Sequence, residues 1–321
     1  MSGSRRGSGG LLAVHAHPDD ETLATGALLA TWAAAGRPVT LVTCTRGERG
    51  EVIGDHLARL EGDGPALAAH RETELAAAAA ALGVTDHLFL DRLPGWHGGR
   101  LEDSGMTWAD EGRRAVAAPD AVAAGTAFST RPLDDVAAAL AALIAARRPD
   151  VVVTYEPGGG YGHPDHVRAH DVTHRAVELA AQGDEPYDVP VVLWAAQGRD
   201  RARAARDALR TPGVDLGPLR APAADDVFAS VVVPEHEVAL EVDVAAVRDA
   251  VLAALRAHAT QVQHAQPVDG CAALVGRYAL SLGVAEPMLP VEQYRMASRS
   301  GTGRGAAPLD LRWPPGVRPV A

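Results

Sequence analysis

The fold is decided by the stretch Leu11–Thr22, which reads LLAVHAHPDDET. Residues 11–15 form the apolar run of a buried parallel strand. A helix pattern follows from Glu21 to Ala35, and Gly36 and Pro38 close it. Ionisable side chains crowd residues 17–21, and so dense a polar group is costly at the end of a buried strand unless it binds something. The stretch therefore predicts a β-loop-α unit with a functional site in its loop.

A second cluster has the same order of residues. Tyr161–His166 reads YGHPDH, and it follows the apolar run Val151–Tyr155 and the glycines at 158–160. In an open parallel sheet, ligands bind outside the carboxyl ends of the strands. Since both clusters come directly after a predicted strand, we expect them to meet at that edge of the sheet. Together they predict the two halves of one metal site.

The order of elements predicts the fold class. Strands and helices alternate over residues 11–181, which is typical of an α/β, Rossmann-like fold with a mostly parallel sheet and helices on both faces. Residues 182–296 mix strand and helix patterns, and we interpret them as a C-terminal extension of a single domain spanning residues 11–296. Residues 91–132 have weak periodicity, which is typical of a functional or disordered loop. Residues 1–10 and 298–321 are expected to be mobile tails.

Composition and charge exclude several classes of protein. The chain has 321 residues, 47% of them hydrophobic, and a net charge of −11. Its field repels phosphate backbones, so nucleic acid is not an expected partner. No apolar run reaches the roughly 18 residues that cross a bilayer, and the run after residues 1–10 is too short for a signal peptide. With two cysteines, Cys44 and Cys271, and no CxxC spacing, we expect a soluble, cytoplasmic protein without membrane partners.

The first cluster suits a catalytic metal. A catalytic zinc ion typically keeps three protein ligands and leaves a position for water. His17 and Asp20 lie three residues apart across the turn, so both can converge on one ion, and His166 lies on the first helical turn of the second cluster. Asp19 projects differently and is free to act as general base. Zn²⁺ is the expected ion, with Fe²⁺ as an alternative because His and Asp donors suit both.

The second cluster adds three further groups. His163 lies one turn before His166 and can polarise a carbonyl or protonate a leaving amine. Asp165 can orient His163 or raise its pKa by its charge. Tyr161 brings a phenol next to the glycines, whose backbone can approach a ligand closely. The two clusters thus combine metal ligands with acid, base and hydroxyl groups.

A simpler interpretation exists for each cluster taken alone. His-Pro-Asp is often a helix start, with Asp as the cap and His on the surface. Two copies at equivalent strand ends favour a metal site instead. We assign His15, the last residue of the apolar run, to the core or to a supporting role. The other histidines of interest are expected in packing, structural, rim or solvated positions: His170, His174, His258 and His264.

These motifs resemble those of the zinc-dependent N-acetylglucosaminyl-phosphatidylinositol deacetylase-like family, also called LmbE-like or PIG-L. The family signatures AHPDDE and HPDH are both present, at residues 16–21 and 163–166. Within the family the chain is most similar to the deacetylases of mycothiol biosynthesis, which remove acetate from N-acetyl-glucosaminyl-inositol. The supporting segments are residues 43–55, 103–106, 151–166 and 257–262, and the similarity spans residues 11–296.

The resemblance implies a role for each matching position. It implies that His17, Asp20 and His166 hold the zinc and that Asp19 is the general base. It also implies that His163 acts as general acid or electrophile, that Asp165 tunes it, and that Tyr161 helps to hold the oxyanion. The implied partner is a small pseudodisaccharide. The positions that match substrate-binding residues of the family are Arg71, Glu51 and Asp103.

Two other functions compete with the deacetylase. A mycothiol S-conjugate amidase of the same family would use the same zinc chemistry on a bulkier acyl group. Amidase relatives tend to place a lysine just after the first motif, and Thr22–Thr25 contains none, which favours the deacetylase. A non-catalytic sugar- or metal-binding module would keep the ligands but would not need Asp19 and His163.

Overall fold

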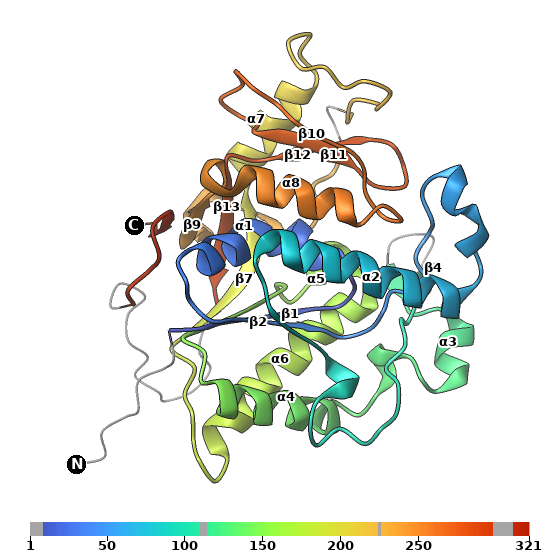
Figure 1. Cartoon of the computed structure of the whole chain (residues 1–321), viewed down its shortest axis with the longest axis vertical. Coiled ribbons are helices and arrows are strands. Elements are labelled where there is room, and N and C mark those ends of the chain that lie inside the picture. The colour runs from blue at the N-terminus through green and yellow to red at the C-terminus, as the bar shows by residue number, and fades with distance from the viewer. Residues whose placement is uncertain (1–8, 110–113, 224–225, 298–310, 321) are drawn as a thin grey trace.

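The computed structural model describes residues 9–109, 114–223, 226–297 and 311–320 (Figure 1). The predicted β-loop-α unit is confirmed. Strand β1 (Leu11–His15) is buried at every position, and helix α1 (Asp20–Ala34) follows after the turn of residues 16–19. Gly36 ends the helix with a left-handed φ of 68°, which glycine adopts without a steric penalty.

The central sheet is mostly parallel, as the alternation of elements predicted. Its further strands are β2 (Val39–Thr43), β3 (Asp86–Phe89), β6 (Val151–Thr154), β7 (Val191–Gly198), β8 (Val232–Val233), β9 (Leu240–Asp243), β13 (Val291–Met296) and β14 (Val317–Pro319). The order is β14-β9-β13-β7-β6-β1-β2-β3, with β8 beside β7. Pairing is parallel from β7 through β6, β1 and β2 to β3. The loops after β1 and β6 therefore leave neighbouring strands at the same edge.

Helices cover both faces of this sheet (Figure 1). They include α2 (Gly64–Leu82), α4 (Leu133–Arg147), α6 (Pro164–Gln182) and α8 (Arg248–Ala257). Leu11 and Ala13 enter the core under α1, α2 and α8, whereas Leu12 and Val14 enter the core over α4 and α6. Both faces of β1 are thus buried, which explains its unbroken apolar run.

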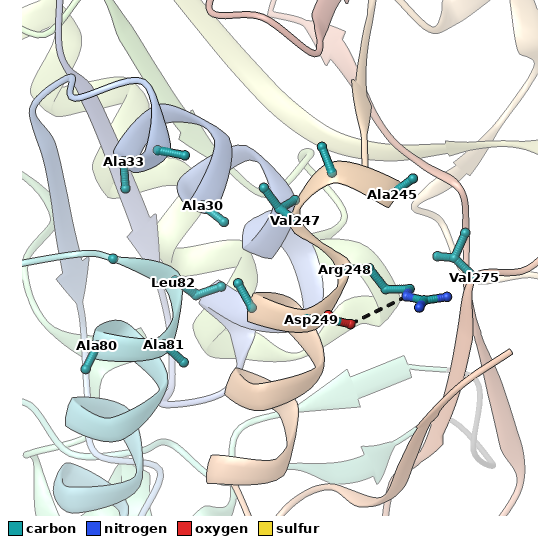
Figure 2. Close-up of a pocket in the computed structure, with 14 residues that line it drawn as sticks. Ala30, Ala33, Ala80, Ala81, Leu82, Ala245, Val247, Arg248, Asp249 and Val275 are labelled. Carbon is teal, nitrogen blue, oxygen red and sulfur yellow. Dashed lines mark ion pairs between the residues drawn. The ribbon is translucent and has the colours of Figure 1, made fainter. Parts of the chain in front are cut away.

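A hollow of about 640 Å³ lies where the end of α1, the end of α2 and the start of α8 meet (Figure 2). Alanines form most of its lining, and Arg248 and Asp249 form an ion pair of 3.6 Å on its rim. The lining holds no cluster of metal-binding or nucleophilic side chains. The chemistry-bearing residues lie elsewhere, at the carboxyl edge of the parallel strands.

The C-terminal extension adds antiparallel strands to the same sheet. β13 pairs with β7 and β9, and β14 pairs with β9. Helix α7 (Arg199–Leu209) and a second sheet of β10 (Gln263–Pro267), β11 (Gly276–Ala279) and β12 (Ala285–Met288) complete it. The expectation of a mobile tail is wrong for residues 317–319, because they form β14, which pairs with β9 and buries Val317. Residues 1–8 and 298–310 of the expected tails lie outside the described residues.

The segment 91–132 has local structure of its own. It contains strands β4 (Thr107–Ala109) and β5 (Arg114–Val116), which pair with each other, and helix α3 (Pro119–Ala124). Neither strand joins the central sheet. Within the described ranges, no helix has the length and apolar character needed to cross a membrane.

Candidate active site

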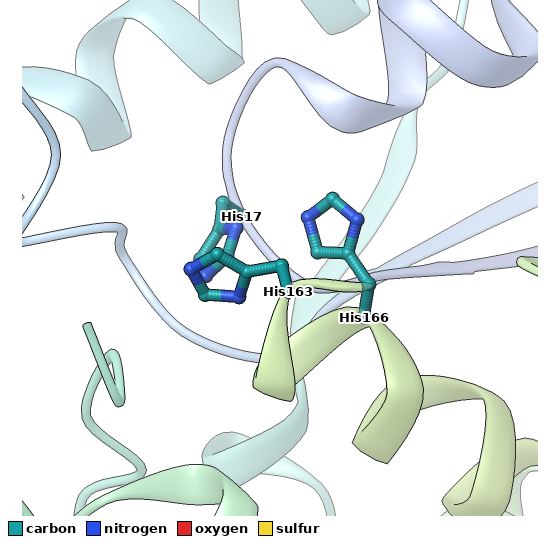
Figure 3. A group of neighbouring side chains, drawn as sticks. All are labelled: His17, His163 and His166. Atoms are coloured by element: carbon teal, nitrogen blue, oxygen red, sulfur yellow. The ribbon is translucent and has the colours of Figure 1, made fainter. Parts of the chain in front are cut away.

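The fold brings both motif clusters into one buried group. β1 and β6 are neighbours, so the turn of residues 16–19 and the loop that contains α5 (Gly159–Gly162) leave the sheet side by side. His17 comes from the first loop, and His163 and His166 come from the start of α6 (Figure 3). One ring nitrogen of each lies within 4.8 Å of the other two, and all three side chains are buried.

Asp20 joins the two histidines that we predicted as its co-ligands. Its Oδ2 lies 3.4 Å from His17 Nδ1 and 3.3 Å from His166 Nε2. Neighbouring ligand atoms of a tetrahedral zinc ion are about 3.3–3.4 Å apart when the bonds are about 2.0–2.1 Å. His166 Nδ1 lies 3.0 Å from the Gly159 carbonyl, which only accepts, so in the neutral ring Nδ1 donates and Nε2 carries the lone pair. This buried Nε2 has no donor and faces a carboxylate, an arrangement that fits a cation between them.

Two carboxylates orient His17 from behind. His17 Nε2 lies 3.2 Å from Asp165 Oδ2 and 3.6 Å from Asp103 Oδ1 and donates toward these carboxylates, while Nδ1 faces Asp20. Burial lowers the pKa of His17, but the charge of Asp103 and hydrogen bonds to three aspartates outweigh it and hold that pKa well above its ordinary value. A second nitrogen bonded to a carboxylate is the usual arrangement for a metal-binding histidine.

Asp19 belongs to the same buried group but makes a different contact. Its carboxylate lies 3.3 Å from Arg71 Nη2, and its backbone has an unusual φ of 118°. Burial raises the pKa of Asp19 to about 6, although the Arg71 charge lowers it. A carboxyl group with this pKa is ionised at neutral pH and can still accept a proton, as a general base must.

The tautomer of His163 distinguishes it from the predicted metal ligands. Its Nδ1 accepts a hydrogen bond of 3.1 Å from the Asp165 amide, so Nε2 must carry the proton when the ring is neutral. Burial, and then the neighbouring His17 and His166, lower the pKa of His163 to about 3. A neutral ring that presents an N–H has no lone pair for a metal but can donate to a carbonyl oxygen. Of the two expected roles, this geometry favours the electrophile.

Asp165 differs from its predicted position. We expected its carboxylate to orient His163, but it contacts His17 Nε2 and accepts the Ser104 amide at 2.9 Å. Only its backbone amide reaches the His163 ring. The reason is the start of α6, where His163 is the N-cap and the fully buried Asp165 side chain of the first turn packs against the first motif instead.

Tyr161 lies at the mouth of the site. Its side chain is half exposed, and its ring centroid is 5.0 Å from that of His166 and 6.1 Å from that of His163. Burial of the hydroxyl, and then the Asp20 charge, raise the pKa of Tyr161 above its ordinary value. The phenol therefore keeps its proton and can donate a hydrogen bond.

The three residues expected to bind substrate lie in different environments. Arg71 is 2% exposed and donates to the carbonyls of Gly47 and Pro18, so it supports the first motif from behind. Asp103 is 4% exposed and accepts the amides of Arg49 and Gly105. Only Glu51 is exposed, where it lines a depression of about 470 Å³. Sequence alone could not separate these cases, because burial of a charged residue depends on its tertiary partners.

Two buried acids of this region received no role from sequence. Glu156 accepts the amides of Gly158 at 2.6 Å and Gly160 at 2.8 Å, and it binds the Ser230 hydroxyl. A carboxylate just before a glycine run was the local signal for it. Glu21 lies 2.7 Å from His258 Nε2, and no local signal exists for two residues so far apart in the chain.

The remaining histidines have structural surroundings. His15 is buried, with Nε2 2.9 Å from the Thr25 hydroxyl. His170 Nδ1 lies 2.9 Å from the Tyr155 carbonyl, and His174 accepts the indole N–H of Trp194. These contacts agree with core and packing positions.

A mostly parallel α/β sheet with a buried group of His and Asp side chains that could hold a metal, and a further buried carboxylate beside them at the carboxyl edge, is typical of a metal-dependent hydrolase. Comparison with protein families agrees with this class. Residues 12–177, more than half of the chain, match the family model described as GlcNAc-PI de-N-acetylase (PIG-L). The chain belongs to this family of hydrolytic N-deacetylases.

Relatives similar over most of the chain bear one name, 1D-myo-inositol 2-acetamido-2-deoxy-alpha-D-glucopyranoside deacetylase. The relative from Kineococcus radiotolerans is 48% identical over 293 residues, which cover 89% of this chain and 76% of the relative. The relative from Streptomyces griseus is 45% identical over 291 residues, which cover 89% and 82%.

Two solved structures are similar to this chain at low sequence identity. N,N'-diacetylchitobiose deacetylase from Pyrococcus horikoshii is 21% identical, with a TM-score of 0.42 over 58% of this chain and 60% of its own. The 4-carboxy-2-hydroxymuconate hydratase from Pseudomonas putida KT2440 is 16% identical, with a TM-score of 0.48 over 92% and 99%.

Proposed function

We propose that this enzyme hydrolyses the acetamide of N-acetyl-glucosaminyl-inositol, 1D-myo-inositol 2-acetamido-2-deoxy-alpha-D-glucopyranoside, to the free amine and acetate in a zinc-dependent step of mycothiol biosynthesis. The observation that carries the hydrolysis is Asp19, a non-ligating acid beside the group of His17, Asp20 and His166. The choice of this pseudodisaccharide is supported by the shared name of the relatives.

The residues of the chain divide the reaction between them. A zinc ion held by His17, Asp20 and His166 would acidify a water molecule to a pKa of about 7 and polarise the acetyl carbonyl. Asp19 accepts the proton of the attacking water, and that proton then passes to the leaving amine. The Nε2–H of His163 donates to the carbonyl oxygen as negative charge develops there, and the Tyr161 hydroxyl donates to it from the mouth of the site. General acid–base help of this kind contributes about 10²–10⁴-fold.

The direct test measures acetate release from the pseudodisaccharide. Metal-free enzyme should be inactive, and one equivalent of zinc should restore turnover. Absence of turnover with zinc bound would rule out this substrate. Purification without oxygen, followed by metal analysis, decides between zinc and ferrous iron, since His and Asp donors suit both.

The amidase alternative concerns the acyl group. The Thr22–Thr25 segment lacks the lysine that amidase relatives tend to carry, which favours the deacetylase. We expect faster turnover of the acetylated pseudodisaccharide than of a mycothiol S-conjugate when both are assayed side by side. Faster turnover of the conjugate would reverse the assignment.

The binding-module alternative predicts ligand binding without turnover. It leaves no role for Asp19, a buried acid whose pKa is raised to about 6 and whose carboxylate lies 3.3 Å from Arg71 Nη2. Metal-dependent release of acetate distinguishes an enzyme from such a module.

Two wider proposals accompany this function. We propose that residues 11–296 form one deacetylase domain, which is supported by the way β9 and β13 extend the central sheet. We also propose a cytoplasmic location, which is supported by the two unpaired cysteines, Cys44 and Cys271.

A further inference from the structure

The backbone of Asp19 is held in a conformation that few residues adopt. Its φ of 118° lies in the region that favours glycine, and it shares a positive φ with only Arg148 and His264 among the described non-glycine residues. Such a conformation persists only when the surrounding structure over-determines it. The contacts around Asp19 must therefore include groups that hold its backbone.

Glu21 is the group that holds the amide. Its Oε2 accepts the Asp19 N–H at 2.9 Å, while its Oε1 accepts the Thr22 hydroxyl at 2.5 Å. A glutamate near the helix start that reaches back to the N-cap amide is one half of a capping box. The other half is missing, because the Asp19 side chain makes no capping bond to α1. The amide is thus satisfied without using the Asp19 carboxylate.

His258 holds Glu21 in turn. His258 Nε2 lies 2.7 Å from Glu21 Oε1, and both side chains are fully buried. His258 stands at the C-terminal end of α8, in the extension, where the next turn is anchored to α2. There the amide and hydroxyl of Thr260 both bind Glu74, at 2.8 Å and 2.6 Å. A continuous chain of contacts therefore runs from α2 through the extension to the Asp19 backbone.

A stabilising role alone does not explain this pair. Apolar side chains of similar volume often replace a buried ion pair without loss of stability. What they cannot supply is an acceptor aimed at one backbone amide. The direction of this acceptor matters because the amide belongs to Asp19. The side chain of that same residue is the acid that accepts a proton in the proposed function.

We propose that Glu21 and His258 are a positioning pair for Asp19: they fix its left-handed backbone and so leave its carboxylate aimed for proton transfer. The C-terminal extension then completes the active site by supplying His258. This proposal rests on the proposed role of Asp19 as general base.

Two variants and a control test the pair. His258→Leu removes the N–H donor, and His258→Gln keeps one. The control is His236→Leu, at an exposed histidine whose side chain has no hydrogen bond or ion pair among the described residues. For each protein we would measure kcat, KM, zinc content, thermal midpoint and the hydrogen exchange of peptides covering residues 16–23.

His258→Leu should lower kcat about 10–100-fold, since small misplacement of a catalytic group has this effect, with KM and zinc content nearly unchanged. Exchange over residues 16–23 should become faster. His258→Gln should restore most of the wild-type kcat and most of the protection from exchange over residues 16–23. The control should match the wild type in both. If His258→Leu does not fold, the double variant Glu21→Met with His258→Leu removes the buried charge as well and gives the same test.

Three results would overturn the proposal. They are an unchanged kcat in the folded variant, a loss of activity that follows loss of zinc, and unchanged exchange over residues 16–23. Failure of the proposed function has a different signature, because the wild-type enzyme with zinc would then release no acetate. Even then, the hydrogen exchange of residues 16–23 shows whether Glu21 and His258 hold the Asp19 backbone.

Discussion

Asp19 has both a strained backbone and a carboxyl group with a raised pKa. Its positive φ costs on the order of 1–3 kcal/mol, which the contacts of Glu21 and Arg71 must offset. Asp is a good N-cap, yet this side chain does not cap α1. Its carboxyl group stays available and, because burial outweighs the Arg71 charge, has a pKa of about 6.

Replacement of this acid should affect turnover and little else. Asp19→Asn should lower kcat about 10²–10⁴-fold with small changes in KM and zinc content, because it removes the base and asparagine tolerates positive φ. Steady-state acetate release and metal analysis measure this. Asp200→Asn, at an exposed acid on α7, is the matched control. A variant that keeps most of its kcat with zinc bound would show that Asp19 is not the base.

The histidines of α6 should separate into a ligand and a donor. His166→Ala should lose the bound metal, whereas His163→Ala should keep it and lose turnover, because only His166 presents a lone pair to the site. Metal content after dialysis distinguishes the two. Equal loss of metal from both variants would mean that the three imidazoles form the ligand set.

Among the elements, the middle of helix α1 is hydrogen-bonded to strand β13 of the C-terminal extension. Glu292 of β13 accepts the amides of Ala27 at 2.6 Å and Leu28 at 2.9 Å, and the Tyr294 hydroxyl at 2.7 Å. A side chain inserted among helix amides competes with the i to i−4 hydrogen bonds. Burial raises the pKa of Glu292 to about 7, and its three hydrogen bonds only partly offset this.

This raised pKa predicts the direction of a pH effect on stability. The folded state binds the Glu292 proton more tightly than the unfolded state, whose value is near 4.5. The stabilising contribution is therefore complete below about pH 4.5 and is lost as pH rises through about 7, at about 1 kcal/mol per pH unit.

Glu292→Gln should flatten the dependence of stability on pH. It should also lower the overall stability, because the NH₂ group of glutamine cannot accept a hydrogen bond from one of the two helix amides. Denaturant unfolding between pH 5 and pH 8 measures the slope. Glu235→Gln is a control at a partly exposed acid. An identical slope in Glu292→Gln and the wild type would contradict the assignment.

In the whole molecule, the proposed metal ligands come from two segments that are distant in the chain. His17 lies in the turn after β1, Asp20 begins α1, and His166 lies in the first turn of α6. The unfolded chain does not hold these donors together, so a bound metal should stabilise the fold as well as the reaction.

Zinc should accordingly raise the thermal midpoint of the wild type. An ion that binds only the folded chain adds about 2.7 kcal/mol at a hundredfold excess over its Kd. His166→Ala should respond weakly, and His236→Leu should respond like the wild type. Scanning calorimetry with zinc or with a chelator measures the shift. A full response in His166→Ala would place the ion at another site.

Much of the fold and the centre of the site could be predicted because their signals are local. An apolar run buried on both faces, followed by polar groups and a helix, identifies β1 and α1 whatever lies elsewhere. Position 165 lacks such a local signal. Its side chain turns toward His17 in the other motif, and only packing decides which neighbour a side chain meets.

From the amino-acid pattern alone follow the mostly parallel α/β class, the strand-end location of both motifs, and His17, Asp20 and His166 as a candidate ligand group. The burial of Arg71 and Asp103, the pairing of residues 317–319 with β9, and the contact of His258 with Glu21 follow from folding alone. The two kinds of information differ in the distance along the chain over which they act. Periodicity and helix starts act over a few residues, whereas burial, ion pairing and pKa depend on groups that folding brings together from distant segments.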